Sequence, residues 1–485
     1  MKRILSLLFV LSLLLTAPSC RRTVLDDKTV SGSAEISRTD TSSEPVSVSS
    51  AFKAPLPSVV SSAPESSRMP TRSMSPAIVS SVPPPPPAPE PIEKIEEATY
   101  NLKQTYTRAL KGVAAAKDYP NIENRHCYNT LSPEDKMIYD KINEAALRLQ
   151  IQINDLPPKD KADGYYYVLE AYMFDRPEVF WLKPWLYYSA MPSGSNYFIQ
   201  LYYDLEFNFQ GGMFLHRDQH VELVDRAAKE IEHKSTQISA ELEKSAAILK
   251  SEDGEYERER KLHDWLLNRL DYDYDALTDR ESRPYCDDVY GGLILGSAVC
   301  VGYTHAMNLL LRNAGVDCMA VGGYADSEQH MWSLVKIDGD WYQLDATWND
   351  WVVDGKQYIG RIFFNITDSE MLSDRSYNEY YVYNPPACNA IKYNFFIYEE
   401  LYFTAANPAS VSNMERIFLK AEDEEWAFIP VKLGENLKTE DFFSIYYMAV
   451  QKANLTLKKK IDCEKGYYYN YYDPWRVLYC FSAYY

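Results

Sequence analysis

The chain has 485 residues, of which 46% are hydrophobic and 25% charged, so a sizeable core can be buried. This length predicts roughly three domains or segments. The formal net charge is −19, and the sequence has no basic stripe of the kind that binds phosphate backbones, which argues against a nucleic-acid-binding protein.

The N-terminus has the pattern of an export signal. A basic start precedes an apolar run at 4–15 that is too short to cross a bilayer as a mature helix, so we predict a signal peptide over 1–19. Ala17 and Ser19 suit simple cleavage. The stretch also resembles a bacterial lipoprotein signal, in which Cys20 would carry the lipid, although Ala17 stands where Leu is usual. The expected location is therefore the outer face of the cell membrane as a lipoprotein, or the medium as a secreted protein.

Residues 20–91 are rich in Ser, Thr and Pro and contain few aromatic residues. Such a segment cannot bury enough apolar area to offset the entropy of ordering it, so we predict a disordered tether. The tether favours the lipid-anchored alternative, because it would carry a folded domain away from a membrane.

Residues 92–254 predict an α+β cap domain. The sequence Ser132-Pro133-Glu134-Asp135 has the form of a helix start, with an N-cap residue, proline at the first position and acids in the first turn. An aromatic, alternating stretch over 185–209, interrupted by the turn residues 192–195, predicts a hairpin. Residues 220–249 return to a helical pattern.

Residues 255–374 predict a second domain of helices followed by strands. We expect helices over 255–270 and 300–314, with Gly315 ending the latter, and strands over 319–324, 330–337 and 341–347. Residues 375–485 are rich in tyrosine and predict a small β-rich C-terminal domain. No further stretch is apolar enough to cross a membrane.

Cys300 stands at the predicted start of a helix. A thiolate is the nucleophilic form of cysteine, and a helix N-terminus favours negative charge there. The free N–H groups of the first turn also offer donors for a developing oxyanion. The alternative is an ordinary buried thiol.

The dipeptide Asp338-Gly339 is the strongest hairpin signal in the chain. With these two residues at the tip, facing residue numbers sum to 677, so His330 and Asp345 lie on one face as diagonal neighbours. A three-residue loop would put them on opposite faces. The two-residue turn therefore predicts that Asp345 orients the imidazole of His330, which in turn activates a nucleophile.

Three motifs resemble those of the transglutaminase-like superfamily. Residues 290–303, around Cys300, resemble its nucleophile motif, 329–332 its histidine motif and 344–348 its aspartate motif. The resemblance implies an α+β fold with a papain-like core, a catalytic triad of Cys300, His330 and Asp345, and reaction through a thioester. Thr304 and His305 depart from the small residues that are common there, which leaves the substrate open.

The resemblance implies an enzyme acting on amide bonds of proteins or cell-wall peptides, by hydrolysis or by transfer to an amine. We favour hydrolysis, since water is always available outside the cell. The alternative is a non-catalytic surface-binding or scaffold protein that retains the fold. The oligomeric state is not indicated by the sequence.

Weaker signals concern substrate binding and cofactors. Tyr290, Trp332 and Trp348 are candidate substrate-binding residues, with core packing as the alternative for each. No cofactor or metal is expected. The acidic loop at 271–279 resembles a calcium loop, but Ala276 stands where such a loop needs glycine, so a solvated turn is preferred.

Overall fold

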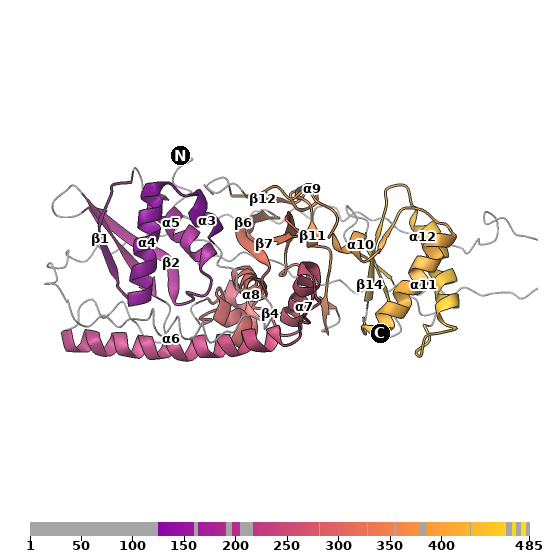
Figure 1. Cartoon of the computed structure of the whole chain (residues 1–485), viewed down its shortest axis with the longest axis horizontal. Coiled ribbons are helices and arrows are strands. Elements are labelled where there is room, and N and C mark those ends of the chain that lie inside the picture. The colour runs from indigo at the N-terminus through magenta and orange to yellow at the C-terminus, as the bar shows by residue number, and fades with distance from the viewer. Residues whose placement is uncertain are drawn as a thin grey trace, which may run out of the picture.

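The computed structural model describes residues 125–159, 163–190, 196–203, 217–280, 282–326, 328–353, 356–378, 385–426, 428–461, 468–471 and 477–481. Figure 1 shows three units in a row, with the N-terminal unit at one end, a central unit, and the C-terminal unit at the other end. The predicted signal peptide, Cys20 and the tether lie outside the described residues.

The N-terminal unit is α+β, as the sequence predicts. Its elements are α3 (His126–Thr130), α4 (Pro133–Arg148), β1 (Gln152–Leu156), α5 (Asp163–Asp175), β2 (Leu182–Ala190), β3 (Tyr197–Tyr203) and α6 (Arg217–Ala246). The strands form an antiparallel sheet in the order β1-β3-β2. The N-cap at Ser132 is confirmed, because its hydroxyl accepts the Asp135 N–H at 3.1 Å. The turn expected at 192–195 lies outside the described residues.

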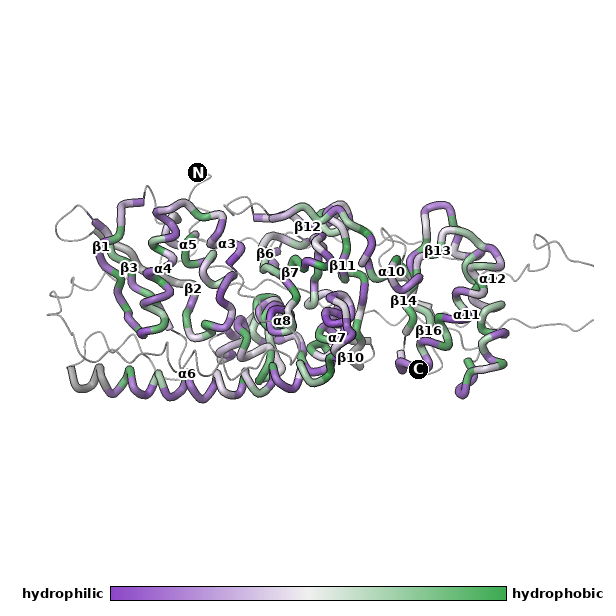
Figure 2. Tube along the Cα trace, viewed as in Figure 1, coloured by the Kyte–Doolittle hydropathy of each residue, from purple (hydrophilic) through white to green (hydrophobic). Residues whose placement is uncertain are grey.

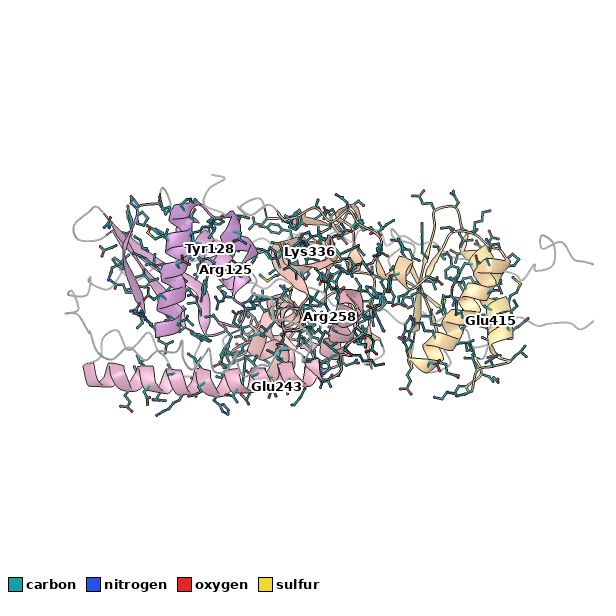
Figure 3. The ribbon with its side chains drawn as sticks, viewed as in Figure 1. Arg125, Tyr128, Glu243, Arg258, Lys336 and Glu415 are labelled. Atoms are coloured by element: carbon teal, nitrogen blue, oxygen red, sulfur yellow. The ribbon has the colours of Figure 1, made fainter. Side chains whose placement is uncertain are left out.

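Two features connect this unit to the rest of the chain. Helix α6 runs beneath the N-terminal unit and reaches the central unit, and hydrophobic and hydrophilic positions alternate along it (Figures 1 and 2). His126 on α3 hydrogen-bonds Asp317 of the central unit at 2.7 Å. Beside it, the Arg125 guanidinium lies over the Tyr128 ring at 3.7 Å, where Figure 3 labels both residues.

The central unit has a five-stranded antiparallel sheet with helices packed on it, together with the two-stranded pairs β4-β5 and β9-β10. Its elements are α7 (Glu255–Leu267), β4 (Asp271–Tyr272), η2 (Asp275–Leu277), η3 (Gly291–Leu295), β5 (Ser297–Ala298), α8 (Cys300–Asn313), β6 (Asp317–Ala325), β7 (Glu328–Ile337), β8 (Asp340–Leu344), β9 (Asp350–Val353), β10 (Lys356–Ile359), β11 (Phe364–Ile366), α9 (Asp368–Met371) and β12 (Arg375–Tyr377). The sheet order is β11-β8-β7-β6-β12, and the buried helix α8 packs against β6 and β7. The sheet extends three residues beyond the boundary expected at 374.

The predicted hairpin is present with the predicted register. Ser333 pairs with Leu344, which gives the sum of 677. Asp338 and Gly339 have φ angles of 51° and 92°, as a two-residue turn of this hand requires. Strand β8 ends at Leu344, so the strand predicted over 341–347 is shorter than expected, and Asp345 is the first residue beyond it.

The C-terminal unit differs from its prediction. Its elements are α10 (Phe395–Tyr398), β13 (Tyr402–Phe403), α11 (Pro408–Asp423), β14 (Phe428–Leu433), α12 (Thr439–Ala453), β15 (Tyr468–Tyr471) and β16 (Val477–Phe481). A four-stranded sheet, β13-β14-β16-β15, is accompanied by helices α11 and α12 of 16 and 15 residues. The expectation of a β-rich domain was wrong, because α11 and α12 bury apolar residues at helical spacing that the tyrosine content obscured.

Within the described residues, no helix combines the length and apolar character needed to cross a membrane. The six cysteines that the structure describes are buried and form no disulfide with one another.

Candidate active site

Cys300 is the first residue of α8, as predicted. The helix follows Val299, whose extended backbone begins it, and no side chain caps the first turn. The N–H groups of Cys300, Val301 and Gly302 therefore have no partner within the helix, and they point toward the end that carries the thiol. The residue is 5% exposed.

His330 lies on β7 and is fully buried. Its Nε2 is 2.7 Å from Asp345 Oδ2, so the predicted contact is present. The imidazole also hydrogen-bonds the Cys300 side chain. Because Asp345 occupies Nε2, Nδ1 is the ring atom left for the thiol. The predicted nucleophile, base and orienting carboxylate are thus connected in one chain of contacts.

Burial lowers the pKa of His330, but the Asp345 carboxylate and the Cys300 side chain outweigh burial and raise it to about 9. Burial raises the pKa of Asp345, but His330 and Arg375 outweigh burial and hold it below its ordinary value. The Asp345 carboxylate is therefore ionised at neutral pH, and the imidazole is protonated. A protonated imidazole beside the sulfur favours the thiolate.

Arg375 is a member of the site that the motifs did not predict. Its Nη2 lies 3.2 Å from Asp345 Oδ2, and both side chains are 0% exposed. The guanidinium lies 4.3 Å from the ring centroids of Trp348 and Phe363. It comes from β12, which pairs with β6. A sequence signal was absent, because 30 residues separate Arg375 from Asp345.

Thr304, which departs from the family pattern, connects the nucleophile helix to the sheet. It is buried, and its hydroxyl lies 2.9 Å from the Cys300 carbonyl oxygen and 3.1 Å from that of Met331 on β7. His305 is also buried. Both departures therefore lie in the interior behind Cys300.

The two tryptophans surround the imidazole. Trp332 is buried and donates from Nε1 to Gln343 at 2.7 Å, and it stacks on His330 at 5.9 Å. Trp348 is half-buried and its ring lies 6.0 Å from the His330 ring, while its backbone N–H donates to Asp345 Oδ1 at 3.0 Å. Trp332 therefore has the core-packing role, whereas Trp348 helps to orient the carboxylate.

Tyr290 lies away from the triad contacts. Its hydroxyl donates to Gln237 on α6 at 2.8 Å, and its ring stacks on Phe180 of the N-terminal unit at 6.0 Å. These contacts favour core packing over a substrate-binding role for Tyr290.

The acidic loop has protein partners for its carboxylates. Asp273 Oδ1 accepts the Ala276 N–H at 3.1 Å, Arg283 pairs with Asp275, and Asp279 accepts from Ser282. Within the part of the chain that the structure describes, no group of three or more His, Cys, Asp or Glu residues is arranged to hold a metal ion. These contacts favour the solvated turn.

Comparisons with known proteins agree with this geometry. Residues 243–346 match the profile of the transglutaminase-like superfamily. Kyphoscoliosis peptidase from Mus musculus is 26% identical over 120 residues, and that from Homo sapiens 27%; each match covers 22% of this chain and 18% of the relative. The chain thus spans less than a fifth of these relatives.

A solved transglutaminase structure aligns with 40% of this chain and 50% of its own, at 16% identity and a TM-score of 0.22. The profile match contains Cys300, His330 and Asp345. Residues 243–346 are therefore a domain of the transglutaminase-like superfamily.

Proposed function

We propose that this protein is an exported cysteine enzyme that acts on amide bonds of proteins or cell-wall peptides through a thioester intermediate. The observation that carries the proposal is the buried chain of contacts from Cys300 through His330 to Asp345, with 2.7 Å between His330 Nε2 and Asp345 Oδ2. The relatives named as peptidases support the same class of chemistry.

In the proposed reaction, the Cys300 thiolate, which lies beside a His330 imidazole that is already protonated, attacks the amide carbonyl carbon. The oxyanion faces the N–H groups of the first turn of α8, which have no partner within the helix. His330 then protonates the leaving amine, and the C–N bond breaks to leave a thioester on Cys300. Water attacks this thioester in hydrolysis, and a second amine attacks it in transfer, with His330 accepting the proton of the attacking group. The C–S bond then breaks, which releases the acid or the new amide and returns Cys300 as a thiolate.

Export and anchoring belong to the same proposal. The apolar run at 4–15, Cys20 and the proline-rich segment that follows support a lipid-anchored protein on the outer face of the membrane. Hydrolysis is the preferred reaction, since water is abundant there. Mass spectrometry of the N-terminal peptide from the native host would find a diacylated Cys20 if the anchor is present, and a free cleaved end if it is not.

A non-catalytic binding protein is the second candidate, and the low exposure of Cys300 favours it. The residue is 5% exposed, and His330 and Asp345 are 0% exposed, so a substrate has little of the triad to reach in this conformation. The two candidates differ in the state of the sulfur, because an enzyme of this class needs a reactive thiolate, whereas a scaffold does not.

Alkylation of the native protein tests the proposal. Iodoacetamide at pH 6 should label Cys300 rapidly, with peptide mapping to separate it from the other buried thiols, and His330→Ala should slow the labelling sharply. The Cys300→Ala variant controls for labelling elsewhere. If Cys300 reacts no faster than a thiol in a short peptide, the proposal of an enzyme is wrong and the non-catalytic binding protein takes its place.

A second experiment separates the two reactions. A glutamine-containing protein and a cell-wall peptide would each be incubated with the enzyme, with and without a labelled amine. Cleavage without incorporation indicates hydrolysis, and incorporation indicates transfer. If neither cleavage nor incorporation occurs although Cys300 is alkylated rapidly, the enzyme uses another acyl donor.

A further inference from the structure

Arg375 occupies a position where a buried positive charge is costly. Its side chain is 0% exposed, and two aromatic rings, Trp348 and Phe363, lie 4.3 Å from the guanidinium carbon. A cation in such a place is stable only when paired and hydrogen-bonded. Its Nη1 lies 2.6 Å from Asp374, and its Nη2 lies 3.2 Å from Asp345.

The contact with Asp345 uses the same oxygen that His330 uses. Oδ2 accepts from His330 Nε2 at 2.7 Å and from Arg375 Nη2 at 3.2 Å, while Oδ1 accepts the Trp348 N–H at 3.0 Å. Three donors on two oxygens leave the carboxylate little freedom to rotate. The oxygen that faces the imidazole is also held by the guanidinium.

We propose that Arg375 is a positioning residue of the acyl-transfer site, which keeps the Asp345 carboxylate ionised and aimed at His330. This inference rests on the proposed function and adds a fourth member to the triad. Arg375 touches neither the thiol nor a substrate, so it acts only through Asp345. The charged or titratable groups that face Asp345 from the elements around it are His330 on β7, Arg375 on β12 and, at longer range, His263 on α7.

The expected effect is a change in pH dependence. An arginine within about 4–6 Å lowers the pKa of a carboxyl by about 1–3 units. Without it, Asp345 takes up a proton at a higher pH and can no longer stabilise the protonated imidazole. The Cys300 thiolate is then protonated at this same higher pH. On acidification, the alkylation rate of Cys300 should therefore fall at a pH about one unit or more higher than in the wild type. If the ion pair of Arg375 and Asp345 were only structural, the pH at which the alkylation rate falls would not change.

Arg375→Met is the first variant, since it removes the charge and keeps an apolar stem against the two rings. Arg375→Gln is the second, because it keeps a donor for Asp345 without the charge and provides the same test if the methionine variant does not fold. Arg375→Lys keeps the charge and should retain most of the wild-type profile. Arg312→Met is the matched control: Arg312 is buried, lies 3.5 Å from Glu178, and stands in the last turn of α8, about 18 Å along the helix from Cys300.

Alkylation rates from pH 4 to 9 give the first readout. The second is the downfield imidazole N–H resonance of the His330–Asp345 hydrogen bond, followed by NMR in a Cys300→Ala background, which does not depend on a reactive thiol. In both neutral variants this resonance should be lost about one pH unit higher than in the protein that retains Arg375. The role of Arg375 is overturned if the neutral variants lose this resonance at the same pH as the protein that retains Arg375. It is also overturned if Arg312→Met changes that pH by as much as the neutral variants do. Slow alkylation of the wild type, with the resonance still displaced, overturns the proposed function alone.

Discussion

Replacing Asp345 with asparagine removes one charge from the centre of the proposed site and changes its shape little. Asp345 is fully buried between His330 and Arg375 and accepts hydrogen bonds on both oxygens. The amide can still accept the Trp348 N–H. It can no longer balance the positive charge of the imidazole, so the variant isolates the electrostatic role of the carboxylate.

The size of the effect follows from the pKa of His330. Asp345 and Cys300 hold that pKa at about 9 against an ordinary 6.5, although burial lowers it. The difference corresponds to about 3 kcal/mol, at about 1.4 kcal/mol per unit. In the variant, burial dominates and the imidazole is neutral at pH 6. An unassisted thiol with a pKa of about 8.5 is only about 0.3% ionised at that pH, so alkylation of Cys300 should slow by roughly 10²-fold.

The assay is iodoacetamide labelling at pH 6, with near-ultraviolet circular dichroism to confirm that the variant is folded. The chain offers a matched control in Asp317→Asn, because Asp317 also lies 2.7 Å from the Nε2 of a histidine, His126, at the junction between two units. The control should label at the wild-type rate. If the folded Asp345→Asn protein labels within threefold of wild type, Asp345 has no part in activating the thiol.

Two further variants test the surroundings of the site. Thr304→Val removes the hydroxyl that bonds the carbonyls of Cys300 and Met331, so urea unfolding should show a loss of about 1–3 kcal/mol; unchanged stability would mean that this link between helix and sheet contributes nothing. Glu259 is buried against Asn365, and burial raises its pKa to about 8. Because the protonated form is favoured in the folded state, its stabilisation is present below pH 4.5 and is lost as the pH rises toward 8. Glu259→Gln should therefore raise the melting temperature at pH 8.5 and leave it unchanged at pH 4.5, and an equal change at both would contradict this.

The local sequence determined the hairpin and the contact between His330 and Asp345. A two-residue turn at Asp338-Gly339 sets the register of both strands, and a register with period two decides which side chains share a face. His330 and Asp345 meet for this reason, even though the strand ends one residue before Asp345. The start of the helix at Cys300 was likewise readable from nearby residues.

Only the tertiary structure decided what surrounds these residues. Arg375 reaches Asp345 because β12 adds to the edge of β6, and no local pattern specifies which distant strand pairs there. The role of Thr304 depends on how α8 packs against β7, and the burial of Trp332 depends on both faces of the sheet being covered. Turn chemistry and side-chain periodicity act between neighbours in sequence, whereas strand order and burial depend on the whole chain. The contact between His330 and Asp345 could therefore be predicted, and the residues packed around it could not.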